Sequence, residues 1–357
     1  MLRPQSIWRA ISFVFPSTMS KTRLPSCAVA MDLARAQRIR QVSAASLDRG
    51  GQSDARSNRS RRFGAHHPPP RVRPLPTAQR QNWEDHPHGW VMNTPTPIRR
   101  GLGIPAGLDP GLARDLAARC VDLGYHSLWS NDEPTAPGLD TLAQFAAAAP
   151  RIELGVGVLP LDRYPPGRIA AEIARLELDP AKLWVGVGSG QLTSPTARVR
   201  AAVTELRRLL PEDTRLVVAA MRPQMCRTGG AVADAVLLNW MLPAHAAAAR
   251  RWVQEGAEQA GRAAPLTSAY VRVAVGPNSL QRLRDEESRY RTINQAHRRH
   301  FDAMNVPLGS VGVAAAARPE LLEALAPYHT ALDLPIARLL AEHDATSLIA
   351  AAIAAAP

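Results

Sequence analysis

Two adjacent carboxylates, Asp132 and Glu133, follow a short apolar segment and could carry acid–base chemistry. Carboxylates at such a position can act as general acid and general base, or Asp132 can hydrogen-bond a ligand. Asn131 precedes them and adds an amide at the same place. The alternative is that both carboxylates only cap the loop that follows.

Two glycine-containing segments are candidates for close approach of a ligand to the backbone. One contains Gly157 and Val158, and the other contains Gly188, Ser189 and Gly190. A glycine lets a flat ring or a phosphate approach where a side chain would clash, although tight packing of a helix on a strand needs the same residue. No complete Gly-x-Gly-x-x-Gly fingerprint, phosphate-binding Walker loop or Ser/His/Asp arrangement accompanies them.

Two other segments could bind an anion or border a cofactor. Met221, Arg222 and Pro223 stand where a helix is expected to begin, and free backbone amides beside an arginine form an anion site. Asn239 and Trp240 end an apolar run, and the indole could line a pocket or simply pack under a loop. The ten histidines show no metal-ligand spacing, so a metal site is not expected.

The elements that would position these residues alternate between strand and helix from Met92 onward. Apolar runs predict eight strands, at 98–104, 126–130, 152–158, 183–187, 215–220, 235–239, 270–275 and 334–340. Helices are predicted between them, including one that Asp109 and Pro110 begin, a single long helix from Ser279 to Met304, and a last one that Asp344 caps.

This alternation predicts an α/β fold, a closed (β/α)8 TIM barrel over residues 92–357. Parallel strands need crossover helices, and eight such units close into a barrel of about 250 residues. A doubly wound open sheet is the alternative. In a barrel the chemistry lies at the C-terminal ends of the strands, which is where the candidate residues fall.

Five strand-end segments, taken in order, resemble the bacterial luciferase-like family of flavin- or deazaflavin-dependent oxidoreductases. The similar segments are 124–132, 151–161, 183–190, 218–225 and 233–240. The resemblance implies a TIM barrel that binds coenzyme F-420, a deazaflavin, or alternatively FMN. The residues it places at the cofactor are Asn131, Asp132, Gly157, Val158, Gly188, Ser189, Gly190, Met221, Arg222, Pro223, Asn239 and Trp240.

Within that resemblance, Asp132 contacts the ring, Gly157 and Val158 form a backbone bulge that often holds a non-prolyl cis peptide, and Arg222 lies at the phosphate. Asp132 and Glu133 are the implied catalytic residues. The implied reaction is hydride transfer between coenzyme F-420 and an organic substrate. Alternatives are an FMN-dependent monooxygenase and a barrel that binds cofactor without turnover.

Three features depart from the family pattern. Glu133 stands where many members have a histidine, and Arg222 replaces a usual glycine. Segment 191–214 lacks the usual long insertion over the substrate. These departures leave the proton donor and the substrate open.

The basic charge of the chain is confined to its first quarter. The chain carries a net charge of +12, but residues 1–91 contain 15 Lys and Arg against 5 Asp and Glu, which leaves +2 for the rest. Only 16 of these 91 residues are Ile, Leu, Val or Phe, which predicts a disordered basic extension. An upstream start with Met92 as the true initiator is expected; a targeting peptide or a nucleic-acid-binding arm are the alternatives.

The remaining expectations concern compartment and assembly. Three unpaired cysteines and no credible export signal predict a cytoplasmic protein. No window of about 18 apolar residues is free of charge, so a membrane protein is not expected. The expected partners are a small-molecule substrate and a second copy of the chain in a homodimer, without metal or nucleic acid.

Overall fold

Eight parallel strands close into a barrel in the computed structural model, which describes residues 99–340 and 344–357. The barrel strands are β1 (Gly101–Ile104), β2 (Ser127–Ser130), β3 (Glu153–Pro160), β4 (Leu183–Gly188), β5 (Arg215–Ala220), β6 (Ala235–Asn239), β7 (Leu266–Val275) and β9 (Leu334–Leu339). Consecutive strands pair from β1 to β7, and β9 pairs with both β7 and β1 to close the ring. The predicted TIM barrel is confirmed.

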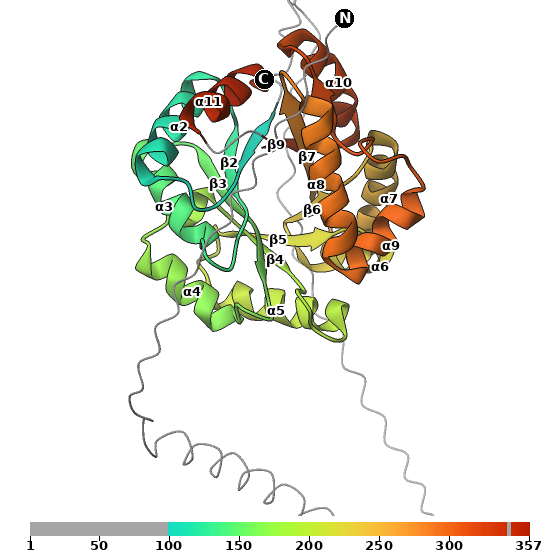
Figure 1. Ribbon diagram of the computed structural model, residues 1–357. Helices are drawn as coiled ribbons and strands as arrows, with labels where there is room; N and C mark the ends of the chain where they lie inside the picture. Colours follow the sequence, from blue (N-terminus) through green and yellow to red (C-terminus); the bar gives the residue numbers. More distant parts are fainter. Residues whose placement is uncertain (1–98, 341–343) are drawn as a thin grey trace, which may run out of the picture. The chain divides into compact units, whose positions relative to one another are not determined.

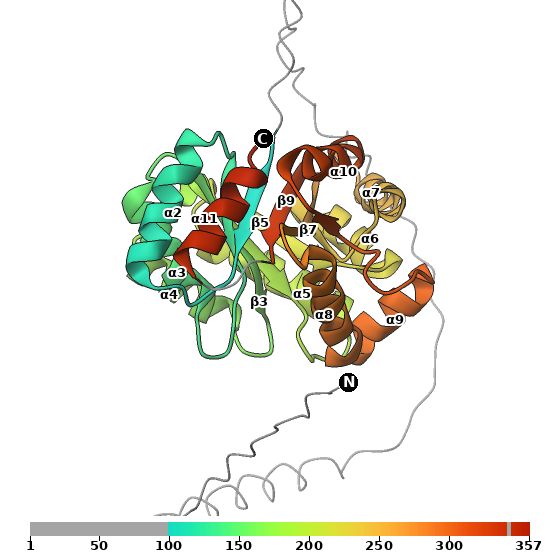
Figure 2. The ribbon, with the colours of Figure 1, turned by 45° about the horizontal axis from the view of Figure 1, so that its top comes forward.

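Helices surround the strands on the outside (Figures 1 and 2). They are α2 (Pro110–Asp122), α3 (Gly138–Ala148), α4 (Pro166–Arg175), α5 (Pro195–Leu209), α6 (Pro223–Val232), α7 (Pro243–Gln259), α8 (Ser279–Ile293), α9 (Gln295–Met304), α10 (Arg318–Ala331) and α11 (Ala345–Ala354), with a 3-10 turn at Pro180–Lys182. As predicted, Asp109 caps α2 through its side chain and Asp344 caps α11. The carboxylate of a capping aspartate accepts hydrogen bonds from backbone N–H groups in the first turn, which have no partner within the helix.

Two elements differ from the sequence prediction. The single long helix predicted from Ser279 to Met304 is wrong, because it is broken at Asn294. The extended backbone of Asn294 ends α8, and its Oδ1 accepts from the backbone N–H of His297 at 2.9 Å to begin α9. A short strand that is not among the eight predicted ones, β8 (Val313–Ala315), pairs with the C-terminal end of β7.

The apolar side chains divide into a layer outside the barrel and a smaller cluster within it. The outer layer packs the helices onto the strands and includes Cys120. The inner cluster contains Trp129, Trp184 and Tyr270. The Trp129 ring lies 6.1 Å from that of Trp184 and 6.4 Å from that of Tyr270, so aromatic rings fill the barrel beneath the site.

The predicted extension, residues 1–91, lies outside the described residues. The domain boundary at Met92 and the disorder of that segment therefore stay predictions.

Candidate functional site

All the sequence-predicted site residues follow the C-terminal ends of β2 to β6, or lie within the last residues of those strands. Parallel strands place these ends on one face of the barrel. The strands thus bring the predicted residues to a common rim. Their side chains, however, turn in different directions.

Asn131 faces the inside of the rim and joins three elements. Its Oδ1 accepts from the backbone N–H of Ala106, after β1, at 3.0 Å and from Arg338 Nη2 on β9 at 3.2 Å. Its Nδ2 donates to Glu133 Oε1 at 2.6 Å. Asn131 therefore connects β9 to the loops after β1 and β2.

Asp132 turns toward the outer helices. Its carboxylate is fully buried and accepts three hydrogen bonds: from the backbone N–H of Gly138 at the start of α3 (3.0 Å), from Tyr164 Oη (3.1 Å) and from Arg163 Nη2 (2.8 Å). Burial raises the pKa of Asp132, although the Gly138 hydrogen bond and the Arg163 charge both act to lower it. The contacts with Arg163 and Tyr164 hold the β2–α3 loop against the β3–α4 loop, and the contact with Gly138 fixes the β2–α3 loop to the start of α3.

Glu133 is exposed, in contrast to its neighbour. Its backbone bridges to Ala136, and its side chain accepts the hydrogen bond from Asn131. The adjacent carboxylates thus have different surroundings, one inside an ion pair and one open to solvent.

The end of β3 carries the expected bulge. The register between β3 and β4 shifts between Val156 and Leu159, and the Gly157–Val158 peptide is cis, as the family resemblance implies. A Cβ on Gly157 would collide with the hydroxyl of Tyr270, and one on Gly188 would lie 2.9 Å from Val158 Cγ2. Both glycines are needed for packing at this part of the rim.

The turn after β4 is closed by a carboxylate. Gly190 has φ +57°, a conformation that glycine adopts at little cost, and a Cβ there would collide with the Asp162 carboxylate. Asp162 Oδ2 accepts from the backbone N–H of Gln191 at 2.9 Å. Ser189 accepts a turn hydrogen bond from Leu192 through its carbonyl.

The loop after β5 leads into α6 as expected. Pro223 is the first residue of α6, Arg222 precedes it, and no side chain of the described residues caps this end. Arg222 is exposed and donates from Nη1 to the carbonyl of Arg299 in α9 at 3.0 Å. Met221 is half-buried in front of this turn. Within the described residues, the first amides of α6 thus have no side-chain acceptor, which suits an anion.

Asn239 and Trp240 lie at the end of β6. Trp240 is 1 % exposed and has φ +54°, and its carbonyl accepts from His300 Nε2 at 2.7 Å. Its ring centroid lies 5.0 Å from that of Tyr290 and 5.4 Å from that of Phe301. Helices α8 and α9 therefore cover this residue.

Three inward-facing residues were not predicted from the sequence: Tyr270 and Arg272 on β7 and Arg338 on β9. Arg272 donates to Asn239 Oδ1 at 2.5 Å and its guanidinium lies 4.3 Å from the centre of the Trp240 ring. A signal was available, since each arginine interrupts an otherwise apolar barrel strand. Burial lowers the pKa of Arg272.

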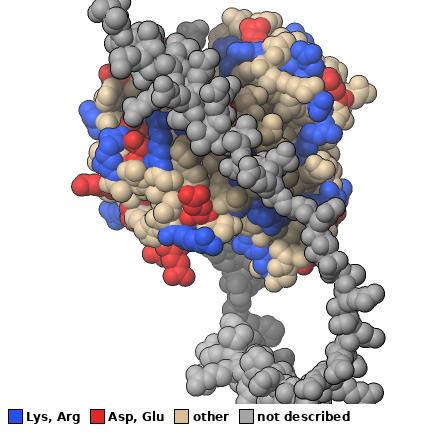
Figure 3. All heavy atoms as spheres, turned by 90° about the horizontal axis from the view of Figure 1, so that it is seen from below, with Lys and Arg blue, Asp and Glu red and all other residues tan. Residues whose placement is uncertain are grey.

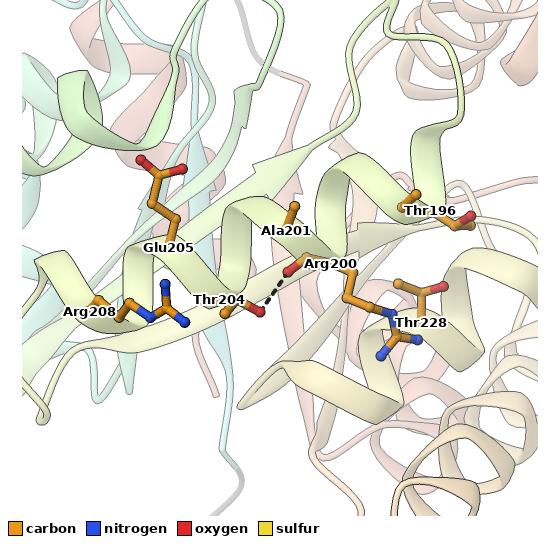
Figure 4. Close-up of a pocket in the computed structure, with 8 residues that line it drawn as sticks. Thr196, Arg200, Ala201, Thr204, Glu205, Arg208 and Thr228 are labelled. Atoms are coloured by element: carbon orange, nitrogen blue, oxygen red, sulfur yellow. Dashed lines mark hydrogen bonds between the residues drawn. The ribbon is translucent and has the colours of Figure 1, made fainter. Parts of the chain in front are cut away.

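Several hollows lie on the described part of the barrel. One of about 450 Å³ lies where β7 and β9 end against α11, and one of about 290 Å³ is lined by Asp132, Tyr164 and residues of α3 and α4. Another, of about 890 Å³, lies outside the rim between α5 and Thr228 of α6 (Figure 4). Its lining contains none of the strand-end residues, so we do not assign the chemistry to it.

Charged side chains of both signs are intermixed on the face shown in Figure 3.

Within residues 99–340 and 344–357, no three His, Cys, Asp or Glu side chains come together in a way that could hold a metal ion. In the same part of the chain, no helix is both long enough and apolar enough to cross a bilayer.

Comparison with solved structures supports the fold. The chain is similar to an F-420-dependent secondary alcohol dehydrogenase in complex with an F-420–acetone adduct (TM-score 0.59, 16 % identity, 72 % of this chain and 99 % of that chain). It is also similar to the coenzyme F-420-dependent tetrahydromethanopterin reductase from Methanopyrus kandleri (TM-score 0.54, 14 % identity, 71 % of this chain and 97 % of that chain).

A third similar structure is the oxygenating constituent of 3,6-diketocamphane monooxygenase from Pseudomonas putida, in complex with FMN (TM-score 0.52, 10 % identity, 72 % of this chain and 97 % of that chain). No protein-family model matches the chain. At these identities the likeness establishes a common fold, the barrel that the family resemblance implies.

Proposed function

We propose that the chain is a luciferase-like oxidoreductase that transfers a hydride between coenzyme F-420 and an organic substrate. The observation that carries this proposal is the likeness over 99 % of the length of a secondary alcohol dehydrogenase that binds F-420. The FMN complex of a similar barrel supports a second candidate, an FMN-dependent monooxygenase.

The rim offers groups that fit such a cofactor. Tyr270 directs a buried hydroxyl without a partner among the described residues toward the bulge at Gly157. The uncapped start of α6, beside Arg222, suits a phosphate. The turn at Gly190 suits a phosphate less well, because the Asp162 carboxylate already accepts a hydrogen bond from the backbone N–H of Gln191 there.

Bound coenzyme F-420 would supply a hydride donor or acceptor, and the chain would supply position and proton transfer. Reduction of a carbonyl needs a proton at its oxygen. We assign that proton to Glu133, which is open to solvent and is oriented by Asn131. We assign Asp132 to holding the rim loops, because its carboxylate is already engaged by three donors.

A fluorescence titration of the full chain with coenzyme F-420 and with FMN tests the cofactor. We expect micromolar or tighter binding of F-420, and about tenfold weaker binding for Arg222→Ala because a charge-assisted contact is lost. Arg151→Ala is the matched control, since this exposed arginine precedes β3 at the opposite end of the barrel. A folded protein that binds neither cofactor would contradict the proposal.

A further inference from the structure

Two arginines lie side by side on the inner face of the barrel. Arg272 of β7 and Arg338 of β9 are direct partners in the parallel register. Register partners on neighbouring strands project from the same face of a sheet. That face is the barrel interior, since Tyr270 and Ile336, two residues before Arg272 and Arg338 on the same strands, both belong to the inner cluster.

Neither arginine has a carboxylate partner within the described residues. The ion pairs of that part of the chain include neither guanidinium. Their side-chain contacts are neutral amides, Asn239 for Arg272 and Asn131 for Arg338. Arg272 is only 4 % exposed. Arg338 is half-buried. A buried and a half-buried positive charge side by side, with no ion-pair partner among the described residues, are costly, so this arrangement calls for an anion.

The polar atoms without partners point to the same conclusion. Arg272 Nε, Trp240 Nε1 and Tyr270 Oη are buried and have no hydrogen-bond partner within the described residues. The Arg272 guanidinium lies 4.3 Å from the centre of the Trp240 ring and 5.9 Å from that of Tyr270. All three groups can donate, and what the cluster lacks is an acceptor.

The electrostatics of a nearby histidine are consistent with excess positive charge. The pKa of His297 is lowered to about 4, first by burial and then by the charges of Arg272 and His300. The acid nearest to Arg338 in the chain on its C-terminal side, Glu342, lies outside the described residues.

We propose that Arg272 and Arg338, with the Trp240 and Tyr270 donors, form an oxyanion site inside the barrel mouth that binds a carboxylate or phosphate group of a small molecule. The proposal rests on the proposed function, because it names a chemical feature of what that site binds. The anion belongs either to the substrate or to the cofactor. Two adjacent guanidiniums bind such groups in a bidentate way that a lysine could not.

Inorganic phosphate tests the site without any cofactor. We expect phosphate to raise the urea midpoint of the full chain beyond the effect of chloride at equal ionic strength. In Arg272→Met and Arg338→Met the apparent phosphate affinity should fall by about tenfold or more. Arg289→Met is the matched control, since this arginine on α8 is paired with Glu286, and its response to phosphate should be unchanged.

Stability without phosphate provides a second readout. Because Arg272→Met removes an uncompensated buried charge, this variant should unfold at a urea concentration no lower than the parent. Glu342→Gln should leave the phosphate response in place. The proposal is overturned if phosphate does not stabilise the parent beyond chloride, if the stabilisation persists in Arg272→Met, or if it depends on Glu342.

Paired titrations identify the source of the anion. If Arg272→Met weakens the binding of FMN but not that of riboflavin, or the binding of F-420 but not that of its phosphate-free deazariboflavin, the site binds the cofactor phosphate. If phosphate binding is lost while both members of each pair bind as before, the site binds the substrate anion. If phosphate binds to the arginines but no cofactor binds, the proposed function fails and the oxyanion site stands.

Discussion

Replacing Asp132 by Ala and by Asn separates the hydrogen bonds of this carboxylate from its charge. Ala removes the acceptor for the Gly138 amide, the Tyr164 hydroxyl and the Arg163 guanidinium. Neutral hydrogen bonds contribute about 1 kcal/mol each and charged ones about 1.5–3 kcal/mol. Since Arg163 is one-third exposed, we expect Asp132→Ala to lower the free energy of unfolding by about 2–4 kcal/mol.

Asn has nearly the same shape and keeps Oδ1 as an acceptor for Gly138 and Tyr164. The raised pKa of Asp132 means that the folded state favours the neutral carboxyl, because desolvation outweighs the ion pair. A neutral isostere should therefore cost less than about 1 kcal/mol. Because this pKa is raised in the folded state, the protonated carboxyl stabilises the fold fully below the ordinary pKa of 3.8, and this stabilisation is lost as pH rises. The free energy of unfolding of the parent should therefore rise relative to that of Asp132→Asn as pH falls toward 4.

Urea unfolding at pH 7 and at pH 4 measures these differences, and cofactor titration of the same samples reports on the site. If Asn destabilises as much as Ala at pH 7, the charge itself holds the loops and the reasoning is refuted. If Asn folds and binds cofactor normally but loses turnover more than about a hundredfold, Asp132 is a catalytic residue and not a positioning one.

Two further perturbations probe the rim. The pKa of His297 is lowered to about 4, so the free energy of unfolding should fall as pH drops from 6.5 toward 4, by on the order of 1–2 kcal/mol for this partly exposed group. In urea unfolding, His297→Gln should lose less stability over the same pH range, and an equal loss would contradict this prediction. Gly190→Ala should cost about 1–3 kcal/mol through its positive φ and the Asp162 contact, with part restored by Asp162→Ala. Gly167→Ala is the control, because open space surrounds that position.

The local order of elements could be predicted from the sequence because it depends on short-range patterns. Apolar runs of strand length separated by helical stripes indicated eight strands, and eight such units have one closed solution in the barrel. Caps such as Asp109 with Pro110 were readable because a helix end needs its acceptor within three residues. The break at Asn294 was not readable, since a polar helix such as 279–304 has no apolar stripe to show where it bends.

The site itself was only half predictable. The sequence places Asn131, Asp132 and Glu133 at one strand end, but only the folded chain turns Asn131 inward to Arg338 and Asp132 outward to Arg163. Arg272 and Arg338 are 66 positions apart and become neighbours because β9 pairs with β7 to close the barrel. Strand patterns determine that a barrel forms, while register and closure across distant segments decide which charges meet inside it.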